Sequence, residues 1–232
     1  MSRYDELKLR AFEANMSLYK QGMVIHTFGN VSASDRRNGV IAIKPSGVDY
    51  GKMRPEDMVV LDMNGNVVEG ELNPSSDTKT HLVLYNAFEG IGGVAHSHST
   101  YAVAWAQAAI PVPIMGTTHA DHLHLDIPVT DFMTPEMIRG DYEIETGHQI
   151  VKRFDKLSFE DVPMVLVAGH GPFTWGGTPE DAVKNNVVLE ALCRMAYLTL
   201  QINPDAVRLP QALIDKHYRR KHGPDAYYGQ SK

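Results

Sequence analysis

The sequence predicts an α/β fold, a three-layer α-β-α sandwich around a mainly antiparallel central sheet. Two hairpins predict the antiparallel strands, because an Asn-Gly pair interrupts each of the extended stretches 30–44 and 58–68. Helical patterns alternate with these strands, so helices are expected to cover both faces of one sheet. The chain is long enough for a large core, and residues 1–232 are expected to form a single domain.

The first part of the chain predicts one helix followed by the two hairpins. Apolar residues recur at helical spacing over residues 2–20. Strands 30–34 and 40–44 flank the first Asn-Gly turn, and strands 58–62 and 67–68 flank the second. This part of the sheet is therefore expected to be antiparallel.

The middle of the chain predicts a helix, a strand and another helix. The first helix follows Pro74-Ser75-Ser76-Asp77, whose side-chain oxygens can cap its N-terminus. A strand over residues 94–99 comes next, and Ser99 or Thr100 can cap the helix after it. Two prolines, Pro111 and Pro113, end that helix.

The second half predicts more helices and one further strand. Residues 116–130 are mixed in character and rich in histidine. The predicted elements that follow are a helical region over 134–154, a buried strand over 164–168, a helix over 178–201 and a last helix over about 210–221.

Composition limits the class of protein and its partners. The hydrophobic fraction of 43% and charged fraction of 22% are those of a globular protein, and the net charge of −6 disfavours a nucleic-acid partner. Cys193 is the only cysteine, so it can form no internal disulfide, and a reducing compartment is expected. The charged N-terminus and the absence of a long apolar run predict a cytoplasmic protein with no membrane partner.

Three histidines are candidate metal ligands. His96 and His98 alternate along the predicted strand, so both imidazoles would point to one face. His170 stands where the buried strand 164–168 ends, and three histidines with an open position are typical of catalytic zinc. Asp77 could be a fourth, weaker ligand. Alternatively, His170 is an ordinary loop residue and Asp77 only caps a helix.

A second group of residues could bind a phosphate monoester. A lysine, hydroxyls, an amide and free backbone N–H groups occur at turns and at a predicted helix N-terminus, where anions bind. These residues are Asn30, Lys44, Ser46, Gly47, Ser75 and Ser76. Each could also be an ordinary turn or cap residue. The functional interpretation gains weight because Ser75 and Ser76 directly precede Asp77, so a phosphate there would lie beside the predicted metal.

Two residues are candidate acids or bases. Asp121 lies in a segment dense in titratable groups, and could carry protons beside a metal-bound substrate. At least two of its neighbours His119, His122 and His124 are expected to be exposed loop residues. Tyr228, in the C-terminal tail after a helix containing His217, could reach another subunit. The alternative for the tail is disorder.

Seven motifs, in order along the chain, together resemble the class II, zinc-dependent sugar-phosphate aldolase/epimerase family, and within it the L-ribulose-5-phosphate 4-epimerases. The motifs are Gly29-Asn30-Val31-Ser32, Lys44-Pro45-Ser46-Gly47-Val48, Pro74-Ser75-Ser76-Asp77-Thr78, His96-Ser97-His98, Gly116-Thr117-Thr118-His119-Ala120-Asp121, His170-Gly171-Pro172-Phe173, and Lys221-His222-Gly223 with Tyr227-Tyr228-Gly229-Gln230. The resemblance runs nearly end to end.

The resemblance implies an α-β-α sandwich assembled as a C4 homotetramer, with active sites between neighbouring subunits. It implies zinc, or another divalent first-row metal, held by His96, His98, His170 and Asp77. It implies phosphate binding by Asn30, Lys44, Ser46, Gly47, Ser75 and Ser76. The implied acid/base pair is Asp121 with Tyr228 of the adjacent subunit, supported by Thr117, Glu143 and His217.

The implied reaction interconverts L-ribulose 5-phosphate and D-xylulose 5-phosphate. Carbon 4 carries no acidic C–H, so cleavage and re-formation of the bond between carbons 3 and 4 is the better route, with the metal as Lewis acid. Asp77 fits a metal ligand better than an acid/base, because aldolases of the family carry a glutamate at this position. Two alternatives are a class II aldolase that releases free aldehyde from a related ketose phosphate, and a non-catalytic metal-binding or assembly module.

Overall fold

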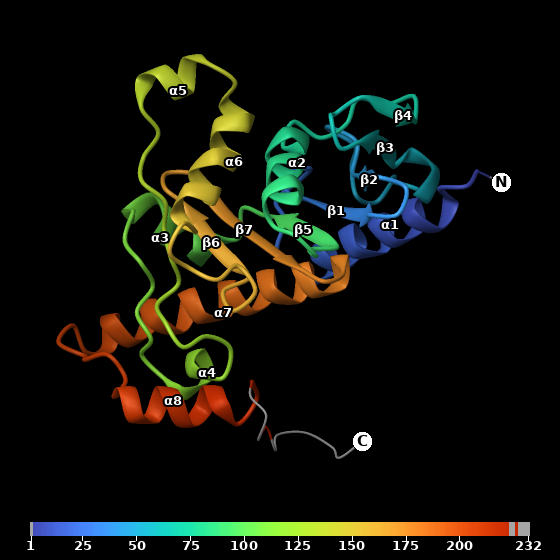
Figure 1. The fold of residues 1–232 in the computed structure, drawn as a ribbon. Coiled ribbons are helices and arrows are strands. Elements are labelled where there is room, and N and C mark those ends of the chain that lie inside the picture. Colours follow the sequence, from blue (N-terminus) through green and yellow to red (C-terminus); the bar gives the residue numbers. More distant parts are fainter. Residues whose placement is uncertain (1, 223–225, 227–232) are drawn as a thin grey trace.

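A seven-stranded antiparallel sheet forms the centre of the described part of the chain (Figure 1), which comprises residues 2–222 and 226 of the computed structural model. The strands are β1 (Asn30–Asp35), β2 (Val40–Ile43), β3 (Val59–Asp62), β4 (Val67–Glu69), β5 (Gly93–His96), β6 (Met164–Val167) and β7 (Gly171–Gly176). Their order across the sheet is β4-β3-β2-β1-β5-β7-β6, and every neighbouring pair is antiparallel.

Helices cover both faces of this sheet (Figure 1), which confirms the predicted α-β-α sandwich. On one face lie α1 (Asp5–Lys20), α3 (Thr100–Ala108) and the long α7 (Pro179–Ile202). On the other face lie α2 (Thr78–Ala87) and α6 (Tyr142–Arg153), and α6 follows the short α5 (Pro135–Arg139). Outside these layers, α4 (Thr117–Ala120) packs against α8 (Gln211–Arg219), and a 3-10 turn, η1 (Pro55–Asp57), precedes β3.

Alternation along the strands supplies apolar residues to both faces of the sheet, and the larger hydrophobic core also includes residues of α3 and α7, such as Trp105 and Leu189. Ile41 and Ile43 of β2 belong to the larger core, together with Leu84 of α2. Val40 and Ala42, the alternate residues, belong to the core against α1. This period of two explains why the strands are apolar on both faces and buried throughout.

Strand β7 has no counterpart in the sequence prediction, although it lies between β5 and β6. Gly171 and Pro172 begin it and Gly176 ends it, so it carries turn signals at both ends. Its apolar residues Phe173 and Trp175 are fully buried and alternate with Thr174. That short alternation was the available signal. The structure also divides the predicted helical region 134–154 into two helices, because Asp141 caps a new helix through Ile144 N–H.

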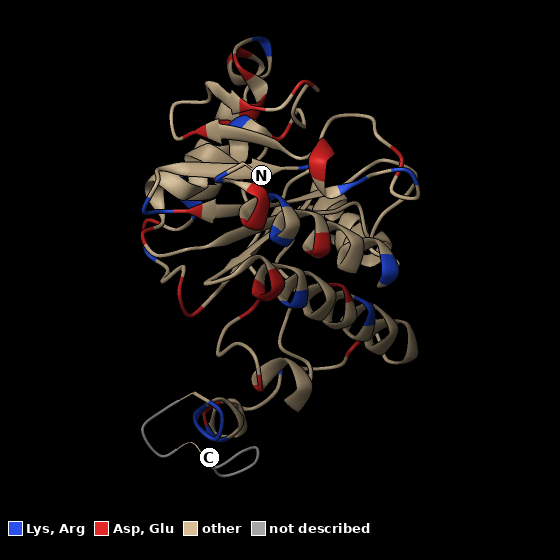
Figure 2. Cartoon of the chain, turned by 90° about the vertical axis from the view of Figure 1, so that its right-hand side faces the viewer, with Lys and Arg blue, Asp and Glu red and all other residues tan. Residues whose placement is uncertain are grey.

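No helix among residues 2–222 combines the length and the apolar character that crossing a bilayer requires. On the face in Figure 2, acidic and basic residues are intermixed over most of the molecule, and basic residues gather around α8.

Candidate metal centre and substrate pocket

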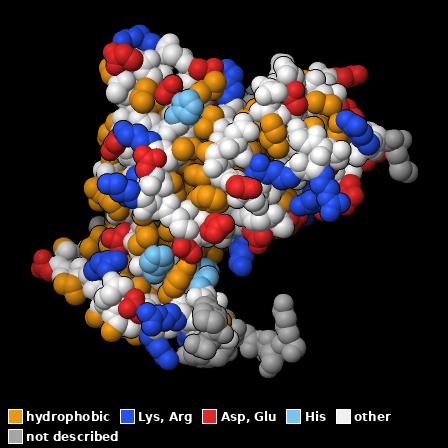
Figure 3. Space-filling view, viewed as in Figure 1, with side chains coloured by type: hydrophobic (Ala, Val, Ile, Leu, Met, Phe, Trp, Pro, Cys, Tyr) orange, Lys and Arg blue, Asp and Glu red, His pale blue; other side chains and the backbone are white. Residues whose placement is uncertain are grey.

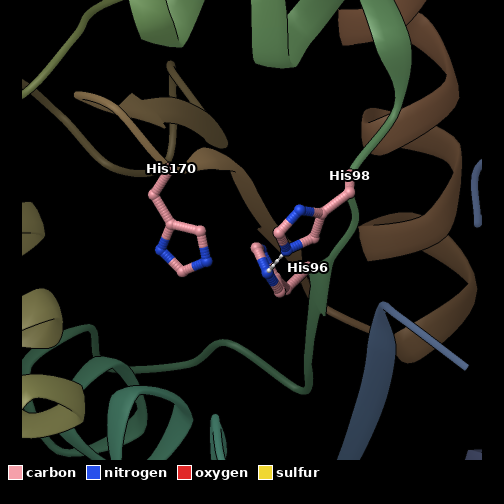
Figure 4. Close-up of side chains that lie close together, drawn as sticks. All are labelled: His96, His98 and His170. Atoms are coloured by element: carbon pink, nitrogen blue, oxygen red, sulfur yellow. Dashed lines mark hydrogen bonds between the residues drawn. The ribbon is translucent and has the colours of Figure 1, made fainter. Parts of the chain in front are cut away.

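Three histidines converge at one end of the sheet (Figure 4). His96 is the last residue of β5, His98 follows two residues later, and His170 lies in the turn between β6 and β7. One ring nitrogen from each lies within 4.8 Å of the others, and His96 Nε2 is 3.1 Å from His98 Nε2. The structure therefore brings together the three histidines that the sequence predicts as metal ligands.

The surroundings of His96 fix which nitrogen faces the cluster. His96 Nδ1 lies 2.9 Å from the carbonyl oxygen of Pro172, which can only accept a hydrogen bond. The ring proton is therefore on Nδ1, and the lone pair of Nε2 points toward His98 and His170. Phe173, which pairs with His96 across β5 and β7, stacks on the imidazole with ring centroids 4.2 Å apart.

Burial favours the neutral, metal-binding form of His98 and His170. It lowers the pKa of His170 to about 3, with a further contribution from the neighbouring His96. Burial and His96 also lower the pKa of His98. Neutral imidazoles are ligands for zinc, whereas protonated ones are not.

Asp77 occupies the N-cap position of α2, but its side chain makes no capping hydrogen bond. Its Oδ2 instead accepts a hydrogen bond of 2.6 Å from Asn30 Nδ2. Burial raises the pKa of Asp77, but attraction to His96 and His81 and the Asn30 hydrogen bond outweigh it, so the net shift is downward. Asp77 is an ionised carboxylate in the pocket of His98 and His170, outside the 4.8 Å cluster of three imidazoles.

These donors fit zinc. Zn–N bonds of about 2.0–2.1 Å in a tetrahedron place two ligand nitrogens about 3.3 Å apart, close to the spacing of the His96 and His98 nitrogens. Three neutral imidazoles leave one position for a further ligand, and the nearby anionic carboxylate favours a cation. Nitrogen ligands of this kind also suit other divalent first-row ions.

One pocket of about 420 Å³ connects the histidines to the predicted phosphate-binding residues. All six of those residues line it: Asn30, Lys44, Ser46, Gly47, Ser75 and Ser76. Backbone hydrogen bonds join the two loops that carry most of them, from Ser46 N–H to Asn73 O at 2.9 Å and from Ser75 N–H to Lys44 O at 3.0 Å. The pocket thus contains serine hydroxyls and a lysine together with His98 and His170, two members of the three-histidine cluster.

Lys44 is a buried cation at this pocket, and its side chain is only 2% exposed. Its ammonium donates to the carbonyl oxygens of Thr27 at 3.4 Å and Pro45 at 3.3 Å, and lies over the ring of Tyr50. Burial lowers the pKa of Lys44, and attraction to Asp49 partly offsets this. None of the ion pairs among the described residues involves Lys44, so an anion in the pocket would compensate a buried charge.

Glycines allow the backbone to turn tightly at two points of the site. Gly29 has φ +92°, and a Cβ there would lie 3.1 Å from the carbonyl oxygen of His96. Gly169 has φ +73°, and it sets the turn that presents His170. A left-handed φ favours glycine at both positions.

The acid/base candidate Asp121 lies elsewhere in the chain. Its carboxylate accepts hydrogen bonds from His217 Nδ1 at 3.0 Å and from Arg220 Nη2 and Nε at 2.7 and 2.9 Å. Burial raises the pKa of Asp121, but these partners outweigh it and lower the pKa to about 2. Asp121, His217 and Thr117 belong to the α4–α8 region beyond α7 (Figure 1), and none of them lines the pocket. Tyr228 falls outside the described residues.

The expectation that at least two of the three neighbouring histidines are exposed is wrong. His119 is buried, and His122 and His124 are half-buried. They lose exposure because α8 packs over this segment, with Tyr218 against the ring of His124.

Two aromatic residues that line the pocket were not predicted from the sequence. The hydroxyl of Tyr142 lies 3.5 Å from His170 Nδ1, and the exposed ring of Phe28 lies 5.8 Å from the ring of His98. Tyr142 directly precedes Glu143, which was predicted and does line the pocket. Phe28 directly precedes the Gly29-Asn30 motif. Adjacency to a predicted site residue was the available signal in both cases.

Comparisons with known proteins agree with this fold. A structure of L-fuculose 1-phosphate aldolase is 26% identical, with a TM-score of 0.78 over 95% of this chain and 97% of that one. An L-fuculose 1-phosphate aldolase from Glaciozyma antarctica PI12 (18% identity, TM-score 0.76, 96% and 84% covered) shares the fold. A putative aldolase/epimerase/decarboxylase from Klebsiella pneumoniae also shares the fold, with 20% identity and a TM-score of 0.73 over 93% of this chain and 99% of that one.

The family model described as "Class II Aldolase and Adducin N-terminal domain" matches residues 10–197. That range contains the three histidines and every residue named above as lining the pocket. The chain therefore belongs to the class II aldolase/adducin N-terminal domain family.

Proposed function

We propose that this protein is an epimerase that interconverts L-ribulose 5-phosphate and D-xylulose 5-phosphate. The observation that carries the proposal is one pocket in which His98 and His170 of the three-histidine cluster face serine hydroxyls and a buried lysine. A sugar phosphate has the matching chemistry, with a dianion at one end and carbonyl and hydroxyl oxygens at the other.

The phosphate would bind at the loops that contain Lys44, Ser46 and Gly47 and at the serines before α2. Lys44 supplies the charge, and Ser75 and Ser76 supply hydroxyls beside the N-terminus of α2, where the helix dipole favours an anion. The amide nitrogen of Asn30 is already engaged in hydrogen bonds, because Nδ2 donates to both Ser75 Oγ and Asp77 Oδ2. It would therefore organise the phosphate site and Asp77 together.

The metal would be held by His96, His98 and His170, with Asp77 as an additional ligand. Zinc bound there would supply Lewis-acid stabilisation of the negative charge that develops on the substrate as a carbon–carbon bond breaks. The position of Asp77 in the pocket beside His98 and His170 supports a ligand role, because an anionic carboxylate there favours a bound cation.

Cleavage between carbons 3 and 4 leaves an aldehyde fragment that still carries the phosphate. The residues around Lys44 would retain this fragment while its aldehyde rotates to present the opposite face, and the bond then re-forms. The hydroxyl on carbon 4 points in opposite directions in substrate and product, so two proton carriers on opposite faces are required. We assign these roles to Asp121 and Tyr228, with Thr117, Glu143 and His217 as supporting residues.

Asp121 can serve this pocket only if a neighbouring subunit supplies it, because within one chain it lies in the α4–α8 region. We therefore propose a C4 homotetramer with active sites between subunits. An apolar groove of about 250 Å³, lined by Trp105, Ile110 and Tyr197 among others, supports subunit contact. Ile202, the last residue of α7, and Val207, just beyond it, are 86% and 82% exposed and add apolar surface there. Figure 3 shows hydrophobic side chains spread over this face of the molecule.

A class II aldolase that releases free aldehyde is the second candidate, and the 26% identity to an L-fuculose 1-phosphate aldolase favours it. The test is to incubate the zinc-loaded protein with L-ribulose 5-phosphate and to follow D-xylulose 5-phosphate and glycolaldehyde phosphate. Xylulose phosphate without accumulated aldehyde is the expected result. Accumulated aldehyde would favour the aldolase. If neither forms from L-ribulose 5-phosphate, the epimerase proposal is wrong and a metal-binding or assembly module is favoured.

A further inference from the structure

The sheet does not fix the position of His98, although His98 belongs to the three-histidine cluster. Strand β5 ends at His96, and His98 lies two residues further on, before α3 begins at Thr100. No strand pairing extends to His98, so other contacts must hold the main chain between the two histidines.

A hydrogen bond joins this stretch of chain to the long helix α7, which packs against β5. The Ser97 hydroxyl donates to Asn186 Oδ1 at 2.8 Å, and both residues are 0% exposed. The same hydroxyl lies 3.4 Å from Ser99 Oγ, beyond His98 in the sequence. Asn186 therefore contacts the residue that links the two histidines.

A second residue of α7 holds the chain on the other side of His98. Glu190 accepts hydrogen bonds from the backbone N–H groups of Tyr101 at 3.0 Å and Ala102 at 2.8 Å, in the first turn of α3. Ser99 occupies the N-cap position of α3, but its side chain makes no capping hydrogen bond there. Asn186 and Glu190 are four residues apart, so they share one face of α7.

The backbone of Ser97 also packs closely against two glycines of the site. A Cβ on Gly171 would lie 3.0 Å from the Ser97 carbonyl oxygen, and a Cβ on Gly29 would lie 3.5 Å from Ser97 Cα. These neighbours leave Ser97 little room to move toward them, and the hydrogen bond to Asn186 ties it to α7.

Stability alone does not explain an asparagine at position 186. Its Oδ1 accepts from Ser97, but its buried Nδ2 has no hydrogen-bond partner among the described residues. A buried amide nitrogen without a partner costs free energy, whereas a leucine of similar size would have no such cost.

We propose that Asn186 is a positioning residue that sets His98 for metal binding through the Ser97 hydroxyl, while Glu190 anchors the start of α3 beyond it. A metal site requires ligand distances within about 0.2 Å of their ideal values, so a small shift of His98 would weaken binding. This inference rests on the proposed zinc-ligand role of the histidines, and it does not depend on which sugar phosphate is the substrate.

Two substitutions remove the same hydrogen bond from opposite sides, Asn186→Leu and Ser97→Ala. Their zinc dissociation constants would be measured by competition with a chromophoric chelator. We expect each variant to bind zinc about 10- to 100-fold more weakly than wild type. The matched control is Asn185→Leu, because Asn185 is the next asparagine of α7 and donates to Trp175 O of β7 instead. The control should bind zinc as wild type does.

Two further readouts separate positioning from a purely structural role. The melting temperature of zinc-free Asn186→Leu should change little, because the variant loses one hydrogen bond and also an unpartnered amide. With cobalt(II) in place of zinc, the visible absorption depends on ligand geometry. This absorption should change in Asn186→Leu and Ser97→Ala but stay as in wild type in Asn185→Leu. A lower melting temperature with unchanged zinc affinity and cobalt absorption would overturn the proposal.

A double-mutant cycle tests whether the two residues act through one contact. Asn186→Leu and Ser97→Ala together should weaken zinc binding no more than either does alone, and additive losses would contradict the proposal. If Asn186→Leu does not fold, wild-type zinc affinity in Ser97→Ala would still overturn it. A wild-type protein that binds no zinc would reject both the ligand role and this inference. The expected zinc results without epimerisation would reject the proposed reaction alone.

Discussion

The histidine pocket and the α4–α8 region differ in what a single chain provides. Beside the three-histidine cluster, two of its histidines, serine hydroxyls and a buried lysine already line one pocket. In the α4–α8 region, Asp121 is bound to three cationic or potentially cationic side chains of its own chain, and lies away from that pocket. One chain therefore contains the binding half of the proposed site, and under the proposed function the proton-transfer half would come from another copy.

The largest expected effect comes from the metal ligands. His96→Ala should remove bound zinc and lower kcat by about 10³-fold or more, because no other group would stabilise the developing charge. Metal content and turnover would be measured together, with His148→Ala on the exposed face of α6 as the matched control. Retention of activity without metal would contradict the role of the cluster.

Asp121 should affect turnover without affecting the metal. Asp121→Asn removes a proton carrier, and we expect kcat to fall by about 10²-fold or more at normal zinc content. Asp131→Asn, at an exposed carboxylate, is the control. Zinc loss in Asp121→Asn would mean that the two regions are not separate.

Lys44 should affect substrate capture. Lys44→Met removes a charged partner of the phosphate, and we expect kcat/KM to fall by about 10- to 100-fold, as for one lost charged hydrogen bond. Lys52→Met, outside the pocket, should have little effect. Unphosphorylated L-ribulose should be an equally poor substrate for wild type and Lys44→Met, and a difference there would place Lys44 elsewhere in the mechanism.

The smallest expected effect is on stability against pH. Burial lowers the pKa of His170 to about 3 in the pocket and that of His119 to about 4 beside α8. Between these values and the ordinary pKa of about 6.5, the unfolded chain binds protons that the folded chain does not. The free energy of unfolding of the zinc-free protein should therefore be highest above pH 6.5 and fall as pH drops.

Substituting each histidine in turn distinguishes the contributions of the two regions to stability. His170→Asn and His119→Asn should both flatten this pH dependence in denaturant unfolding at pH 5 to 8. Stabilisation by added zinc at pH 7 should disappear in His170→Asn and persist in His119→Asn. Equal loss of the zinc effect in both variants would show that the regions are coupled.

Local patterns predicted most of the fold. The Asn-Gly pairs located both hairpins, and the residues before α2 and after β5 located those elements, because turn and cap preferences act over a few residues. Strand β7 was missed because its alternation is short and lies between glycines. His98 lies close to His96 although it is not in the same strand, because β5 ends at His96 and His98 follows two residues later.

The site was predictable where neighbouring residues carry the chemistry and unpredictable where distant packing decides. The six predicted phosphate-binding residues come from three short sequence motifs, and all of them line one pocket. Tyr142 reaches the site through the packing of α6 against α2, which no local pattern specifies. The separation of Asp121 from the pocket follows from α8 packing on α4, a contact between residues nearly one hundred positions apart.

Mixed oligomers of two inactive variants test the central claim most directly. His96→Ala lacks a metal ligand and Asp121→Asn lacks the proton carrier, so each should be inactive alone. If active sites form between subunits, random 1:1 mixing should restore about a quarter of the wild-type sites, since each site needs one intact half from each neighbour. Mixed assembly would be verified by native mass spectrometry. Mixed oligomers that form and stay inactive would contradict the account.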